Sequence, residues 1–90
     1  MSDDQDDELF AKTQLLQAIE NQIKSETPPA ALATLNKLTL VGYEREDILD
    51  LMTHVLAYEI KNMMKADRGF DMAWYETALR ALPDLPPEED

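Results

Sequence analysis

The stretch that decides the fold is residues 44–66, EREDILDLMTHVLAYEIKNMMKA. Its apolar residues recur every three or four positions, which is the spacing of an amphipathic helix. They sweep a wide arc of the helical wheel and are Ile48, Leu49, Leu51, Met52, Val55, Leu56, Ile60 and Met63. Glu46 and Asp47 near the start, with Lys61 and Lys65 near the end, match the helix dipole. The stretch therefore predicts a long central helix around which the other elements pack.

Glycines and prolines divide the rest of the chain into three further helices. Gly42 and Gly69 each follow an apolar-periodic run, as helix-ending glycines do. Thr27 followed by Pro28 suits an N-cap with proline in the first turn. The predicted helices cover residues 6–24, 28–41, 44–66 and the run from Asp71 to Pro83.

The last run has its own start signal. Asp71 is placed to cap the helix, and Phe70 and Tyr75 have the spacing of a hydrophobic staple. The predicted connections, 25–27, 42–43 and 67–70, are short, which favours antiparallel neighbours. No stretch alternates with period two for long enough to be a strand. The sequence therefore predicts an all-α, up-down or slightly orthogonal four-helix bundle, in a single domain over residues 1–90.

Acidic residues are concentrated at the two ends of the chain. The net charge is −11, with five acids in residues 1–8 and four in residues 84–90. Between them, ten acids face all eight basic residues, so the body is nearly neutral. We interpret 1–5 and 84–90 as flexible acidic tails. Direct nucleic-acid binding is not expected, because Lys and Arg do not cluster.

The residue types argue against catalysis, cofactors and metals. The chain has no cysteine, which excludes disulfides and thiolate zinc sites. His54, the single histidine, follows Asp50 by four residues, but a metal site needs three or four converging ligands. We interpret the two as an exposed pair on one helix face. No apolar run is long enough to span a bilayer, and the acidic first residues do not resemble a signal peptide, so we expect a cytoplasmic protein.

Two polar residues break the apolar arcs. Glu59 falls within the arc of the central helix, and Gln22 within the arc of the first. Buried carboxylates need hydrogen-bond donors, and a glutamine amide supplies two. We therefore predict that Gln22 and Glu59 form a buried polar pair that fixes helix register. The alternative is that Glu59 is a perturbed acid in a binding pocket.

Apolar residues outside the core faces form a candidate interaction surface. These residues are Phe10, Tyr58, Met64 and Trp74. Phe10 and Met64 point away from the apolar arcs of their helices. Such residues can form a patch for a partner or for a second copy of the chain.

Several short motifs resemble a group of small all-helical bacterial domains of unknown function. The pattern consists of Glu20-Asn21-Gln22-Ile23, Pro28-Pro29, Leu38, Gly42-Tyr43, Arg45-Glu46 and Glu59-Ile60, and it extends over roughly residues 9–82. Members of this group carry several histidines that this chain lacks, so a metal role does not transfer. The resemblance implies an all-helical bacterial protein.

These observations favour a non-enzymatic module for protein–protein interaction or regulation, with a homodimer left open. The alternative from another class is a helical protein that binds a small ligand or metal in a pocket around Glu59. A third reading is an acidic antagonist of a nucleic-acid-binding partner, which would need the acids gathered on one face, whereas nine of the nineteen lie in the tails.

Overall fold

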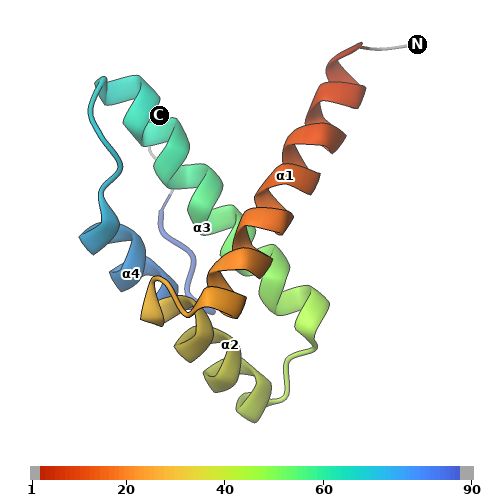
Figure 1. Cartoon of the computed structure of the whole chain (residues 1–90), viewed down its shortest axis with the longest axis vertical. Helices are drawn as coiled ribbons and strands as arrows, with labels where there is room; N and C mark the ends of the chain where they lie inside the picture. Colours follow the sequence, from red (N-terminus) through yellow and green to blue (C-terminus); the bar gives the residue numbers. More distant parts are fainter. Residues whose placement is uncertain (1–2, 88–90) are drawn as a thin grey trace.

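The computed structural model describes residues 3–87, with side chains from residue 11 onward, as four helices (Figure 1). The helices are α1 (Asp3–Ser25), α2 (Pro29–Val41), α3 (Arg45–Ala66) and α4 (Met72–Ala81). No β-strand occurs in residues 3–87, so the prediction of an all-helical chain with four helices is confirmed for this part.

The central position of α3 is also confirmed, because α1, α2 and α4 all pack against it. Figure 1 shows α1 and α4 on opposite sides of α3, with α2 across the lower end. There α2 contacts the other three helices. The two long helices cross above α2, and beyond the crossing the first turns of α1 and the last turns of α3 stand apart (Figure 1).

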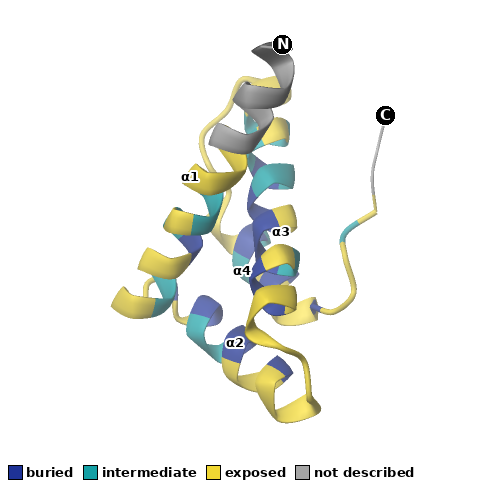
Figure 2. Cartoon of the chain, turned by 90° about the vertical axis from the view of Figure 1, so that its right-hand side faces the viewer, coloured by how far each residue is buried: buried dark blue, intermediate teal, exposed yellow. Residues whose placement is uncertain are grey.

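The core lies where the helices converge. Figure 2 shows the buried residues on the inward sides of α2, α3 and α4. The buried apolar residues are Ile19, Ala30, Ala31, Leu35, Leu38, Ile48, Leu49, Met52, Val55, Leu56, Tyr75, Ala78, Leu79 and Leu82. Among the described side chains of α1, residues 11–25, only Ile19 is one of them. Most of the described length of α1 therefore contributes half-buried or exposed side chains.

Local signals set the helix ends, with two corrections. Gly69 does not end α3, because the left-handed residue at that end is Asp67 at φ 52°, whose N–H bonds the Met63 carbonyl. Gly42 ends α2 at φ 112°, where a side chain would be strained, and its N–H bonds the carbonyls of Leu38 and Thr39. At the start of α4, the Asp71 carboxylate accepts from the N–H of Trp74 at 3.0 Å, as predicted. Thr27 is not the cap of α2. Pro28 occupies that position, and the Thr27 hydroxyl donates to the carbonyl of Ser25.

The two ends of the chain were predicted to be flexible tails. Helix α1 begins at Asp3, so residues 3–5 are helical and not part of an irregular tail. After α4 the chain turns back, and the Tyr58 hydroxyl of α3 donates to the carbonyl of Pro87 at 2.6 Å. Residues 1–2 and 88–90 lie outside the described part, and the flexibility of the ends stays a prediction.

The C-terminal end of α4 is capped by side chains of α2. The buried hydroxyl of Thr34 donates to the Leu79 carbonyl at 3.0 Å, and the Lys37 ammonium donates to the carbonyl of Arg80. The last carbonyls of a helix lack the usual partner four residues on, and at this end the Leu79 carbonyl has a local substitute, the N–H of Leu82 at 3.2 Å. Two residues three positions apart on α2 therefore satisfy two such groups of α4 and fix its end.

We expect Thr34→Val to lower the free energy of unfolding by about 0.5–1.5 kcal/mol, because the Leu79 carbonyl would lose its hydroxyl donor and keep only the N–H of Leu82. The control is Thr77→Val, since the exposed Thr77 hydroxyl bonds a carbonyl of its own helix. Urea denaturation of both variants measures the difference. Equal effects of the two substitutions would contradict the role assigned to Thr34.

Candidate functional site

Glu59 is buried, as predicted, with an exposed fraction of 0 %. Its carboxylate accepts two hydrogen bonds from the Arg68 guanidinium, at 2.6 and 3.1 Å, and one from the backbone N–H of Asp71, at 2.8 Å. The bonds from Arg68 lower the pKa of Glu59 more than burial raises it, and the Asp71 N–H lowers it further. Glu59 is therefore held as an ionised carboxylate inside the protein.

The predicted pair between Glu59 and Gln22 is wrong. Gln22 lies half-buried on α1, and its amide oxygen accepts from the Tyr75 hydroxyl of α4 at 2.7 Å. Gln22 and Glu59 both interrupt the apolar faces of their helices, as predicted, but Gln22 bonds α4 and Glu59 bonds the connection between α3 and α4. Arg68 was the missed partner. The signal for it was present, because a buried carboxylate calls for a cation and Arg68 follows the central helix directly.

The contacts of Glu59 serve the connection between α3 and α4. Arg68 also donates to the carbonyl of Gly69 at 2.8 Å, and Asp71, whose N–H binds Glu59, caps α4. The carboxylate thus fixes residues 67–71 from inside. With no exposed surface, it offers nothing to a ligand in solution, so the geometry gives a binding pocket around Glu59 no support.

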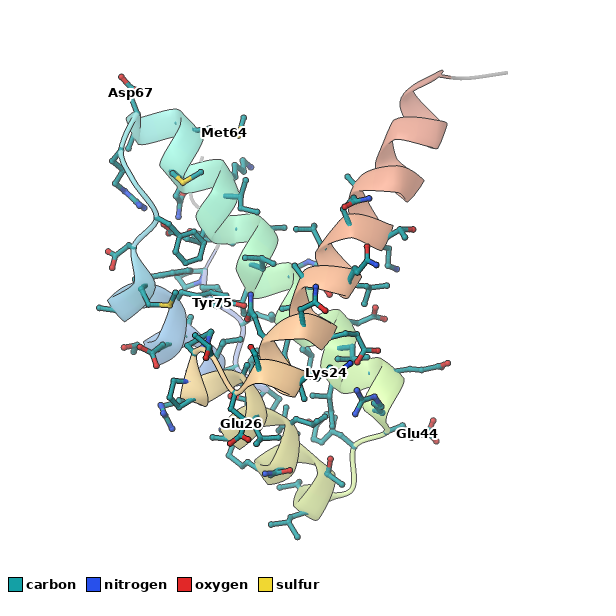
Figure 3. All side chains as sticks on the ribbon, viewed as in Figure 1. Lys24, Glu26, Glu44, Met64, Asp67 and Tyr75 are labelled. Carbon is teal, nitrogen blue, oxygen red and sulfur yellow. The ribbon has the colours of Figure 1, made fainter. Side chains whose placement is uncertain are left out.

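Tyr75 is the largest fully buried side chain, and Figure 3 shows it at the centre of the molecule. Phe70 packs edge-on against its ring, with centroids 5.2 Å apart, as the predicted staple requires. Burial raises the pKa of Tyr75 to about 12, because ionisation would place a charge in the core. The hydrogen bond from Tyr75 to Gln22 connects α4 directly to α1.

The predicted interaction surface does not form one patch. Tyr58 and Trp74 stack with centroids 5.4 Å apart and planes inclined by 17°, so α3 and α4 bring these two together. Met64, which is 72 % exposed, lies on another side of α3 and faces α1. The Phe10 side chain lies outside the described residues. The set therefore divides between an aromatic stack and the space between α1 and α3.

That space is an apolar groove, which we call the α1/α3 groove. It consists of two adjoining hollows of about 470 and 450 Å³ that share Ala11, Leu15 and Ala57. The first is also lined by Lys12, Asp50, Thr53 and His54, and the second by Gln14, Ile60, Lys61 and Met64. Figure 3 places Met64 near the free end of α3, on the arm that diverges from α1. The groove could not be predicted from the sequence, because the pattern of a helix gives the faces of that helix alone and not its position relative to a second helix.

Charged side chains stand at the rim of the groove. Lys12 and Asp50 approach to 3.8 Å across it, and both are well exposed. Asp50 thus pairs with α1, whereas the sequence paired it with His54, which is exposed in the same hollow. Among the side chains that the structure describes, no three histidine, aspartate or glutamate residues converge on one point. Lys61 stands at the other end of the groove.

We expect Arg68→Ala to lower the free energy of unfolding by about 2–3 kcal/mol at neutral pH. This is below the range for a fully buried pair, because the Arg68 side chain is 38 % exposed. The control is Arg45→Ala. Arg45 pairs with Glu20 where both side chains are about half exposed, and that loss should stay below about 1 kcal/mol.

The effect of Arg68→Ala also depends on pH. Because the pKa of Glu59 is lowered in the folded chain, its contribution is complete at neutral pH and declines as the pH falls through that pKa. Without Arg68, burial favours the protonated acid. The stability difference between the wild type and Arg68→Ala should therefore shrink below about pH 4. Urea denaturation along a pH series measures this, and a difference that grows on acidification would contradict the ion pair.

The raised pKa of Tyr75 predicts a loss of stability at alkaline pH. The unfolded tyrosine ionises near pH 10 and the folded one near 12, so the stability is complete below about 10 and falls as the pH rises. Between about pH 8 and about pH 11 this amounts to about 1.4 kcal/mol. The variant Tyr75→Phe should lose this pH dependence, whereas Tyr43→Phe, at an exposed position, should retain it.

Comparison of the chain with models of known families, with curated proteins and with solved structures gave no significant match. Within residues 3–87, no helix has the length and apolar character needed to cross a bilayer. Support for a function therefore comes from the contacts and the surface of the chain itself.

Proposed function

We propose that the protein is a cytoplasmic, non-enzymatic interaction module that binds a helical segment of a protein partner in the α1/α3 groove. One observation carries this proposal. Two long helices cross, diverge beyond the crossing and leave between them a groove lined by Ala11, Leu15, Ala57, Ile60 and Met64. Apolar surface of this extent gains free energy when another surface covers it.

The lining of the groove suits a helix. Alanines at positions 11 and 57, one on each arm, leave room for a backbone to approach closely, and Leu15 and Ile60 provide larger apolar walls. Met64 is unbranched and adapts to partners of different shape. An amphipathic helix that lays its apolar face into such a groove is a common mode of peptide recognition. The proposal includes the slightly orthogonal packing that the sequence predicted. Helices that cross at an angle diverge beyond the crossing, and this divergence opens the groove.

The polar groups of the interior support a binding role over a chemical one. Among the described residues, every buried side-chain nitrogen and oxygen has a hydrogen-bond partner within the chain. Glu59, Thr34 and Tyr75 are all used to join helices. The groove itself carries its charges at the rim, where they orient a partner and contribute to the association rate.

Site-specific photo-crosslinking in the producing cell tests the proposal. We expect a photoreactive phenylalanine analogue at Ala57 or at Met64 to give discrete covalent adducts with a protein chain, because both positions line the groove. The matched control places the same analogue at Ala73, which is exposed on α4 outside the groove. Adducts that form equally at Ala73, or at none of these positions, would contradict the groove as the binding surface.

A further inference from the structure

We propose that the stacked rings of Tyr58 and Trp74 form a binding site for a proline-rich segment of a partner protein, and that residues 85–87 of this chain occupy the site until such a segment displaces them. The site lies on α3 and α4, and neither aromatic residue lines the α1/α3 groove. The inference therefore concerns a second surface and goes beyond the proposed function. Three features carry it: the aromatic stack, the segment that reaches it, and the hydrogen bond between them.

The two rings are held firmly but are not covered completely. Both side chains are half-buried, and their ring planes are nearly parallel. Tyr58 directly precedes Glu59 on α3, and Trp74 directly precedes Tyr75 on α4, and both of these following residues are fully buried. The stack is thus attached to well-packed positions of two helices. Surfaces lined by aromatic side chains are the ones on which proline-rich segments dock in known recognition modules.

The segment that reaches the stack contains two successive prolines. Residues 85–87 are Leu85, Pro86 and Pro87, and they belong to no helix or strand. Pro86 is half-buried, whereas Leu85 and Pro87 on either side of it are exposed, so one side of the segment faces the protein. A proline fixes its own φ and restricts the residue before it to extended backbone, so two in a row favour the polyproline II conformation.

The hydrogen bond supplies what a proline-rich segment requires from its binding site. Proline has no backbone N–H, so such a segment offers carbonyl oxygens and needs donors from the other side. The Tyr58 hydroxyl donates to the Pro87 carbonyl at 2.6 Å. The indole N–H of Trp74 is a second donor in the same stack. The contact within this chain therefore has the chemistry by which a separate proline-rich segment would be recognised.

The resident segment can be displaced, because little holds it in place. A neutral hydrogen bond such as the one from Tyr58 shifts an equilibrium only about two- to tenfold. The segment competes mainly through its attachment to the chain, which gives it an effective concentration of about 1 mM or more. A partner with a longer proline-rich segment would cover more of the two rings than residues 85–87 do. Such a partner gains the site by releasing the end of this chain.

Peptide binding to the full-length chain gives the first test. The probe is the peptide LPPLPP with blocked ends, which repeats residues 85–87 and carries no charge. Trp74 is the only tryptophan in the sequence, so its fluorescence reports binding at the stack. We expect a saturable change, with affinity about tenfold higher for the double variant Pro86→Gly/Pro87→Gly, because the glycines remove the extended preference of the resident segment. The control peptide LAALAA should give no saturable change.

Each opposite result of this titration overturns the inference. A double variant that shows no saturable change up to about 10 mM LPPLPP lacks the site, because the resident segment itself acts at about millimolar concentration. Equal affinity of the wild type and the double variant shows that residues 85–87 do not occupy the site. Equal binding of LPPLPP and LAALAA shows that the stack does not recognise proline. Urea denaturation of the double variant confirms that it is folded.

A second test locates the peptide on the surface of the chain. In the double variant, adding Tyr58→Phe keeps the ring but removes the donor, so the affinity for LPPLPP should fall about two- to tenfold. Tyr43→Phe, in the connection between α2 and α3, and Met64→Glu, in the α1/α3 groove, should leave it unchanged. Binding that is lost with Met64→Glu and retained with Tyr58→Phe belongs to the groove, which would overturn this inference and leave the proposed function standing.

Discussion

The arrangement of the helices depends on one buried carboxylate. Glu59 receives three hydrogen bonds, and all three donors belong to Arg68 and Asp71 in the connection that follows α3. Asp71 in turn caps α4, so the carboxylate fixes where α4 begins. That start places Tyr75 in the core, where its hydroxyl reaches Gln22 on α1. The crossing of α1 over α3, and with it the groove, is thus tied to a charge inside the protein.

A buried charge of this kind stabilises only when it is fully bonded, because an unpaired carboxylate costs several kcal/mol to bury. The requirement makes the contact selective. No arrangement of residues 67–71 that leaves out either Arg68 or the Asp71 N–H satisfies Glu59 equally well. An apolar residue at the same position would pack against many arrangements of that connection. The directional hydrogen bonds to Glu59 therefore set the position of α4, and the apolar side chains of the core pack against α4 in that position.

The comparison of sequence and structure separates what periodicity specifies from what packing decides. Spacing alone was enough to predict four helices, the central role of α3, the Asp71 cap and the contact between Phe70 and Tyr75. It also showed that Glu59 is buried. Residue spacing could not predict the partner of Glu59, because a helical wheel gives the side of the helix on which a residue lies and not the element that packs against that side. Residue spacing could not predict the groove for a related reason. The divergence of α1 and α3 depends on the angle at which they cross, and the repeat of apolar residues does not set that angle.

The short helix α4 is held at both of its ends, and this has a consequence for how the protein moves. Its ten residues are too few to stay helical alone. Asp71 and Glu59 hold the first turn, and Thr34 and Lys37 of α2 hold the last carbonyls. A helix fastened in this way does not fray from one end while the other stays docked. Its amides should therefore exchange with solvent only when the whole core opens, so that α4 and the core form a single cooperative unit.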